Sequence, residues 1–183
     1  MKMPKKTVDQ QMKELFEHFS KQDHSESHIE SLEEPWLYSI WDVNQKFLFC
    51  QNNILVAAPR NSNSQEELIA VTPNRNIKQK DEHTYPIFIG INGGKQVLSC
   101  LESGGQPKLQ LVEKDIMTLY YNNEEHKNFT FFSKTGQTQE ACSIESIAFP
   151  GWFLSTSPEP DKPVAFSHEG GTMITLFYFD KKK

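Results

Sequence analysis

The feature that most constrains the fold is a succession of short apolar and β-branched runs that begins at Trp36 and continues almost to the end of the chain. Turn-forming residues separate the runs, among them Asn52-Asn53 and several Gly-Gly pairs. The expected strands are residues 36–43, 47–51, 54–58, 67–72, 87–91, 96–101, 108–113, 129–133, 142–146, 152–155, 164–167 and 172–179. About twelve short strands predict a closed or sandwich-like all-β domain. Only residues 115–121 suggest a helical turn.

The first 34 residues have a different character. Thr7 and Gln10 have the spacing of a capping box, and apolar residues follow at helical spacing, namely Val8, Met12, Leu15, Phe16 and Phe19. We expect an amphipathic helix over residues 7–20, which is either transient or docked because an isolated helix of this length is marginal in water. Residues 22–34 are polar and acidic, as in an exposed linker. We therefore divide the chain into an N-terminal segment, 1–34, and a β domain, 35–183, which we expect to fold alone.

Composition excludes several classes of protein. A net charge of −5 argues against a nucleic-acid partner. No apolar run approaches the roughly 20 residues that a membrane helix needs, and no hydrophobic stretch follows the N-terminal lysines, so we expect neither membrane insertion nor a secretory signal. The three cysteines, Cys50, Cys100 and Cys142, are expected to be buried small hydrophobes rather than disulfides. His24 and His28 lie in the linker, where a metal site is not expected.

Residues 144–156, I-E-S-I-A-F-P-G-W-F-L-S-T, predict a strand, a tight turn and a second strand. Pro150 fixes φ and Gly151 tolerates a left-handed conformation, so the turn is expected at Phe149-Pro150-Gly151-Trp152. A large aromatic side chain after a turn is usually a packing anchor, and we expect Trp152 to be buried.

This stretch resembles the sequence pattern of the interleukin-1 family, with Glu145, Ser146, Pro150, Trp152 and Ser155 on its positions in order. The resemblance extends over most of residues 36–180. Residues 40–46 and 52–57 are similar to the receptor antagonists of the family, whereas residues 115–120 are closer to its interleukin-36 branch. It implies a β-trefoil cytokine without an active site or cofactor, whose partner is an immunoglobulin-domain receptor of the interleukin-1-receptor type.

The resemblance also implies contact residues. The patch used by the receptor antagonist corresponds here to Trp41, Gln45 and Tyr178, and alternation along the last strand places Leu176 and Tyr178 outward. Leu176 stands where agonists commonly carry Asp, and an apolar side chain cannot pair with a basic accessory receptor. We therefore lean towards a receptor antagonist of inflammatory signalling. The alternative is an agonist of the interleukin-36 type.

Processing and export are further expectations from the resemblance. Mature ends in the interleukin-36 branch lie nine residues before an apolar-x-Asp motif, here Ile40-Trp41-Asp42, so a protease is expected to cut in front of Ser31. We expect a monomer that is made in the cytoplasm and secreted without a signal peptide. Asn128 begins a glycosylation acceptor sequence that such a route would bypass.

Three other classes are less well supported. A fibroblast-growth-factor-like trefoil would need a basic cluster that binds heparin, and the sequence offers only Lys181-Lys182-Lys183. A trefoil lectin would want a Gln-x-Trp repeat in each third of the domain, which the three tryptophans do not supply. An enzyme would want convergent acid, base and nucleophile groups, and none is recognisable.

Overall fold

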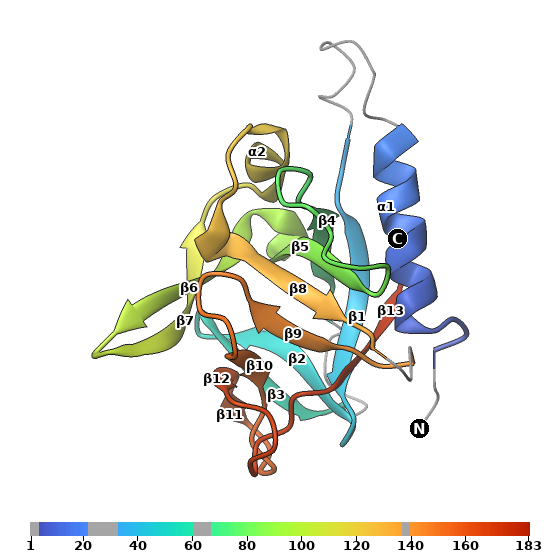
Figure 1. Cartoon of the computed structure of the whole chain (residues 1–183). Coiled ribbons are helices and arrows are strands. Elements are labelled where there is room, and N and C mark those ends of the chain that lie inside the picture. Colours follow the sequence, from blue (N-terminus) through green and yellow to red (C-terminus); the bar gives the residue numbers. More distant parts are fainter. Residues whose placement is uncertain (1–3, 22–32, 61–66, 137–139) are drawn as a thin grey trace.

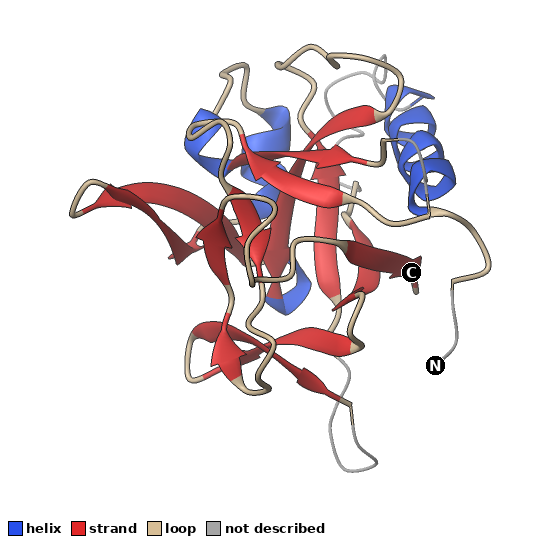
Figure 2. Cartoon of the chain, turned by 60° about the horizontal axis from the view of Figure 1, so that its bottom comes forward, coloured by secondary structure: helices blue, strands red, loops and turns tan. Residues whose placement is uncertain are grey.

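The computed structural model describes residues 4–21, 33–60, 67–136 and 140–183, and it is built almost entirely of strands (Figures 1 and 2). The strands are β1 (Trp36–Asp42), β2 (Lys46–Gln51), β3 (Ile54–Pro59), β4 (Ile69–Pro73), β5 (Thr84–Ile91), β6 (Gln96–Ser103), β7 (Gln106–Glu113), β8 (Thr130–Lys134), β9 (Ser143–Ser146), β10 (Phe153–Ser155), β11 (Lys162–Pro163), β12 (Ala165–Ser167) and β13 (Phe177–Lys181). The helices are α1 (Val8–Lys21) and α2 (Ile116–Tyr121), with 3-10 turns η2 (Asn92–Gly94) and η3 (Lys127–Phe129). The expected all-β class is confirmed.

Strands β1, β4, β5, β8, β9 and β13 form a barrel in which neighbouring strands are antiparallel. The ring closes where Cys142 and Phe177 exchange two backbone hydrogen bonds of 2.9 and 2.8 Å. Three hairpins, β2–β3, β6–β7 and β10–β12, join the barrel at β1, β5 and β9 respectively. The β6–β7 hairpin projects furthest from the body (Figure 1).

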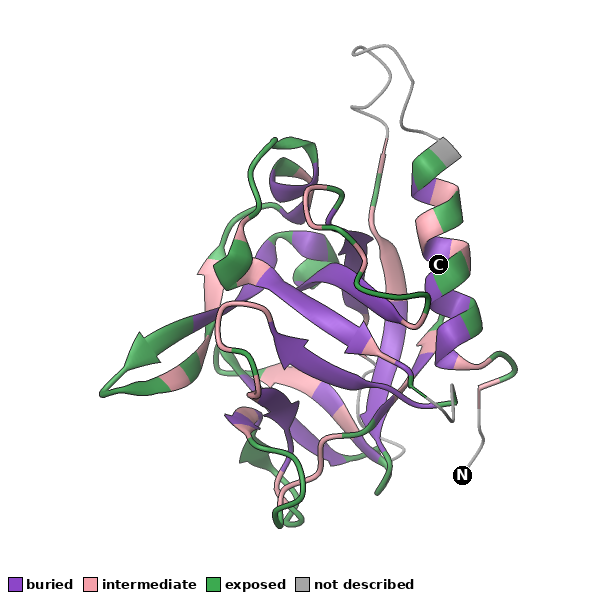
Figure 3. Ribbon diagram, viewed as in Figure 1, coloured by how far each residue is buried: buried purple, intermediate pink, exposed green. Residues whose placement is uncertain are grey.

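The barrel is filled by side chains of alternate strand residues, as the two-residue period requires. Most residues of the barrel strands are buried (Figure 3). The largest of them are fully buried and include Tyr38, Tyr85, Phe131, Phe177 and Phe179. Cys100 and Cys142 are buried and Cys50 is half-buried, and all three are free thiols. Burial raises the pKa of Cys142 to about 12. Cys100 and Cys142 are therefore buried small side chains, as expected, whereas the expected burial of Cys50 is only partial.

Local turn chemistry agrees with the sequence. Asn52 and Asn53, both left-handed with φ of 53° and 65°, make the tight turn of the β2–β3 hairpin. Several predicted strand bounds shift by one to three residues, and two assignments need a larger correction. The last strand begins at Phe177 rather than at 172, since residues 171–173 form a bend. Lys162–Pro163 forms the short strand β11, which pairs with Ala57 and Val56 of β3. The sequence around it has no alternating pattern that would predict a strand.

Helix α1 confirms the expected helix and lies against the barrel (Figure 1). The Thr7 hydroxyl accepts a 3.1 Å hydrogen bond from the Gln10 amide, as expected of a capping residue. Val8, Met12, Leu15 and Phe19 are all 0% exposed and belong to the same core cluster as the barrel side chains. The core therefore includes side chains from outside residues 36–180, and the independent folding of residues 35–183 stays a prediction.

Three further expectations concern membrane insertion, metal binding and the N-terminal linker. Neither helix in the described residues has the length and apolarity that crossing a bilayer requires. Within the same ranges, no group of three or more His, Cys, Asp or Glu side chains is arranged to hold a metal ion. The proposed linker histidines, His24 and His28, and the expected cleavage position at Ser31 lie outside the described residues.

Candidate functional site on the β1–β2 hairpin and strand β13

An aromatic row crosses the outer surface where the β1–β2 hairpin meets β13. Trp41 is the register partner of Phe47 on one side and of Tyr178 on the other. The Trp41 ring stacks on Phe47 at a centroid distance of 5.1 Å and lies 5.9 Å from the ring of Tyr178. The Arg60 guanidinium, next to the end of β3, lies 3.9 Å above the centre of the Phe47 ring, a cation–π geometry. We call Arg60, Phe47, Trp41 and Tyr178 the aromatic row.

The position of Trp41 within this row corrects the sequence prediction. We expected its side chain to face outward, but it is only 4% exposed because the rings of Phe47 and Tyr178 enclose it. Its indole nitrogen is buried without a hydrogen-bond acceptor among the described residues. Phe47 and Tyr178 are half-buried, so they present the accessible aromatic area of the row.

The tip of the β1–β2 hairpin is fixed by the buried carboxylate of Asp42. One oxygen accepts hydrogen bonds from the backbone amides of Asn44 and Lys46, at 2.8 and 3.0 Å. The other lies 2.9 Å from the Lys46 ammonium and accepts a 2.5 Å hydrogen bond from the Thr156 hydroxyl. The Asp42 and Lys46 side chains are 0% and 4% exposed. This network ties the hairpin to the chain beyond β10 and holds Gln45 in place.

Exposed side chains surround the aromatic row. Gln45 is exposed at the hairpin tip, with a left-handed φ of 71°. Val43 is 38% exposed and Leu176 is 45% exposed, and the Val43 amide donates a 3.1 Å hydrogen bond to the Leu176 carbonyl. The expected outward position of Leu176 is confirmed. The four residues predicted from sequence, Trp41, Gln45, Leu176 and Tyr178, thus lie on two adjacent segments of one surface.

The surface lacks an exposed carboxylate on these two segments. Asp42 is the acidic residue of 41–46, and its side chain is fully buried against Lys46. Residues 176–179 are all uncharged. The patch therefore offers a partner aromatic and aliphatic area, the exposed amide side chains of Asn44 and Gln45, and the cation of Arg60.

The predicted turn at Phe149-Pro150-Gly151-Trp152 is present. The Trp152 amide donates to the Phe149 carbonyl at 3.1 Å, and Gly151 has φ of 88°, which is the geometry of a type II turn. Glu145 accepts a 2.8 Å hydrogen bond from the Gly151 amide, and the Ser146 hydroxyl accepts one of 3.1 Å from the Phe149 amide. The Glu-Ser and Pro-x-Trp parts of the pattern therefore hold one turn together.

Trp152 itself is half-buried rather than fully buried. Its ring lies 4.0 Å from the ring of His168 and packs against the core cluster, to which Leu154 belongs at 1% exposed. Trp152 thus packs against the core as expected, but it is not buried, and it lies one residue before β10 begins at Phe153. Pro150 and Trp152 are structural residues of the turn, and they do not belong to the aromatic row.

Phe47 and Arg60 are site residues that the sequence analysis missed. Phe47 lies in a predicted strand, but its face can be assigned only once its register with Trp41 is known. Arg60 lies just beyond β3, and the register of β2 with β3 carries it to the Phe47 ring. The sequence offered one hint for Arg60, namely its position shortly after a predicted hairpin that contains aromatic residues.

A six-stranded barrel that carries three hairpins defines a β-trefoil. The family model described as Interleukin-1 / 18 matches residues 58–179. The chain belongs to the interleukin-1 family of cytokines, and it is not an enzyme.

Several relatives show the same likeness over most of the domain. The human interleukin-1 receptor antagonist protein is 39% identical over 151 residues, which cover 79% of this chain and 78% of the relative. Human interleukin-36 alpha is 38% identical over 146 residues, covering 79% and 90%. Among solved structures, chicken interleukin 1 beta superimposes with a TM-score of 0.69 at 28% identity, covering 81% of this chain and 97% of the other. The solution structure of interleukin-36alpha gives 0.66 at 34%, covering 81% and 94%.

Proposed function

We propose that this chain is an extracellular receptor ligand that binds an interleukin-1-receptor-type ectodomain through the aromatic row and the exposed residues beside it. Arg and aromatic side chains are the residue types that most often dominate the energy of a protein interface. Here they lie in register across β2, β1 and β13, with Gln45 and Leu176 at the rim. The family membership of the chain supports the same class of partner.

We further propose that the ligand acts as an antagonist. The observation that carries this is the exposed Leu176, which stands beside Val43 on a patch whose nearby carboxylate, Asp42, is buried. Without an exposed acid at this place, the surface has no partner for a basic accessory receptor. The likeness to receptor antagonist proteins at about 40% identity favours the same reading.

An agonist of the interleukin-36 type is the second candidate. Interleukin-36 alpha matches at nearly the same identity as the receptor antagonist and over a larger share of its own length. The two candidates make the same prediction for receptor binding, and they differ in whether the complex recruits the accessory chain.

The test combines binding with signalling. The full chain is measured by surface plasmon resonance against separate family ectodomains, and then on reporter cells that carry both receptor chains. We expect binding without signal, competition with an agonist, and gain of signal in Leu176→Asp. Leu101→Asp, on the distant β6–β7 hairpin and 37% exposed, is the matched control and should stay silent. Strong signalling by the unaltered protein would identify an agonist, and absence of binding to every ectodomain would contradict the proposed class of partner.

Processing, export and assembly complete the proposal. We infer that a protease cuts before Ser31, and that the protein is released from the cell and acts as a monomer. N-terminal sequencing of protein recovered from the medium of expressing cells tests the first point, with Ser31 expected as the new end. Light scattering of the same material tests the monomer.

A further inference from the structure

Helix α1 occupies a groove between β13 and the connection from β4 to β5 (Figure 1). Its contacts resemble those of a bound ligand, because they combine an apolar stripe with polar groups that each have specific partners on the barrel. The stripe, Val8, Met12, Leu15 and Phe19, is fully buried. Phe19 packs edge-on against Tyr120 at 5.2 Å between ring centroids, and Phe16 lies 5.5 Å from Tyr85.

Gln11 provides the first specific polar contact. Its side-chain nitrogen donates a 2.6 Å hydrogen bond to the Phe179 carbonyl, and its side-chain oxygen accepts a 3.0 Å hydrogen bond from the Lys181 amide. The amide of Gln11 thus pairs with the outer edge of β13 as a neighbouring strand would. Gln11 is 4% exposed, so these two bonds are made out of water.

Asp9 provides the second specific polar contact between α1 and the barrel. One carboxylate oxygen accepts hydrogen bonds from the hydroxyls of Thr135 and Tyr85, at 2.6 and 2.9 Å, and lies 2.8 Å from Nδ1 of His83. The other oxygen lies 3.2 Å from the ammonium of Lys13 on the next turn of α1. The side chain is 3% exposed. The barrel thus contributes three polar groups that converge on one acidic residue of the helix.

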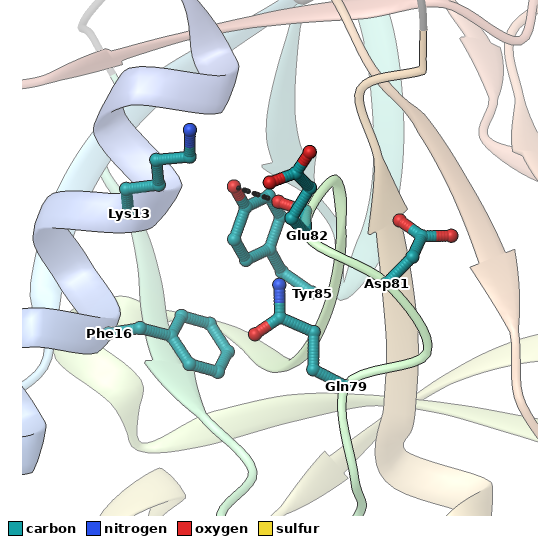
Figure 4. A pocket seen from close by; sticks show the side chains of 6 residues that line it. All are labelled: Lys13, Phe16, Gln79, Asp81, Glu82 and Tyr85. Carbon is teal, nitrogen blue, oxygen red and sulfur yellow. Dashed lines mark hydrogen bonds between the residues drawn. The ribbon is translucent and has the colours of Figure 1, made fainter.

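The groove is wider than the helix on one side. A hollow of about 410 Å³ lies between α1 and the β4–β5 connection, lined by Lys13, Phe16, Gln79, Asp81, Glu82 and Tyr85 (Figure 4). Asp81 and Glu82 place negative charge on the same rim as Lys13 of the helix. The rim therefore complements a helix with a basic residue at this position.

We propose that this groove is a binding site for an amphipathic helix, and that residues 8–21 remain bound in it as a separate peptide when the chain is cut between 22 and 32. The connection from Lys21 to the first strand is the one covalent path from α1 to the barrel. The contacts between α1 and the barrel given above are non-covalent and involve no residue of that connection. A cut therefore yields a two-chain protein rather than a domain without its helix.

The test uses the full chain with a site-specific protease sequence inserted between residues 22 and 32. After cutting, native gel filtration and mass spectrometry show whether the N-terminal peptide travels with the larger fragment. We expect co-elution, release in denaturant, and slow exchange with an excess of a fluorescently labelled peptide of residues 4–21. Asp9→Ala or Gln11→Ala in the labelled peptide should weaken its binding at least about tenfold, because each leaves buried barrel groups without a partner. Glu17→Ala, on the exposed face of α1, is the matched control and should bind unchanged.

A peptide that elutes alone after cutting would overturn the proposal, whether the larger fragment stays soluble or precipitates. Equal binding of the Asp9, Gln11 and Glu17 variants would also overturn it, because the groove would then lack specific recognition. Neither outcome depends on a receptor, so the proposal fails or stands apart from the receptor-binding function.

Discussion

The carboxylate of Asp42 and the hydroxyl of Thr156 form a 2.5 Å hydrogen bond across 114 residues of sequence. Thr156 lies just beyond β10, and Asp42 ends β1, so this bond joins the predicted receptor surface to the hairpin that carries the family pattern. The same carboxylate holds the buried ammonium of Lys46. The shape of the β1–β2 tip thus depends on a buried ion pair.

Asp42→Ala should destabilise the protein by about 3–5 kcal/mol, because it leaves the Lys46 charge buried without a partner. Urea unfolding monitored by tryptophan fluorescence measures the change. Asp161→Asn is the control: Asp161 is exposed and left-handed, a conformation that Asn tolerates, so its stability should be unchanged. A loss of less than about 1 kcal/mol in Asp42→Ala would mean that Lys46 leaves the interior at little cost.

Trp41→Ala and Tyr178→Ala should separate stability from binding. Trp41 is buried between two rings, and its truncation should cost about 3–5 kcal/mol of stability. Tyr178 is half-buried at the surface, and its truncation should weaken receptor binding by about 2 kcal/mol with a smaller effect on unfolding. The measurements are urea midpoints and plasmon resonance on the same preparations. An unchanged urea midpoint in Trp41→Ala would show that Phe47 and Tyr178 do not enclose the Trp41 side chain in solution.

Gly151→Ala should cost about 1–2 kcal/mol, because φ of 88° places an L side chain in the left-handed region. An added Cβ meets no atom within 4 Å, so the cost is conformational rather than steric. Gly171→Ala is the matched control, since it also has open space but no positive φ, and it should be neutral. Equal stabilities of the two variants in thermal unfolding would contradict the assigned turn.

Asp9 should make the protein more stable above pH 4 than below pH 2. Burial alone would raise the pKa of this carboxyl, but hydrogen bonds with Thr135, His83 and Tyr85 and the charge of Lys13 outweigh burial and lower the pKa to about 2. The folded state therefore holds the proton more weakly than the unfolded state, whose pKa is about 3.9. The contribution is complete above that value and is lost as the pH falls towards 2.

Unfolding of wild type and Asp9→Asn between pH 5 and pH 2 tests this contribution. The Asn variant should be less stable at pH 5, and its stability should fall less steeply with acid. Parallel pH profiles for the two proteins would show that Asp9 has the same pKa folded and unfolded.

Features that depend on neighbouring residues could be predicted from the sequence. The Asn52-Asn53 turn and the turn at Phe149–Trp152 follow from the dihedral preferences of those residues, and the apolar spacing of Val8, Met12 and Leu15 specifies a helix. The short strand Lys162–Pro163 has no such local pattern, because its pairing with β3 alone defines it.

Features that depend on register could not be predicted. Trp41 is a good surface anchor by residue type, but its burial requires Phe47 and Tyr178 on both neighbouring strands. The docking of α1 likewise depends on groups far away in sequence, such as Thr135 and Lys181. Half of the aromatic row, namely Phe47 and Arg60, could therefore be recognised only in three dimensions.

Strand β13 has a consequence for how the two proposed sites interact. Gln11 of α1 bonds Phe179 and Lys181, and Tyr178 of the aromatic row directly precedes Phe179 on the same five-residue strand. If receptor binding shifts this strand, the shift changes the free energy of the helix in its groove. Thermodynamic linkage then requires the helix to change receptor affinity by the same factor, in the same direction. The presence of α1 in its groove would thus change the affinity of the aromatic row for the receptor, although α1 makes no contact with the receptor itself.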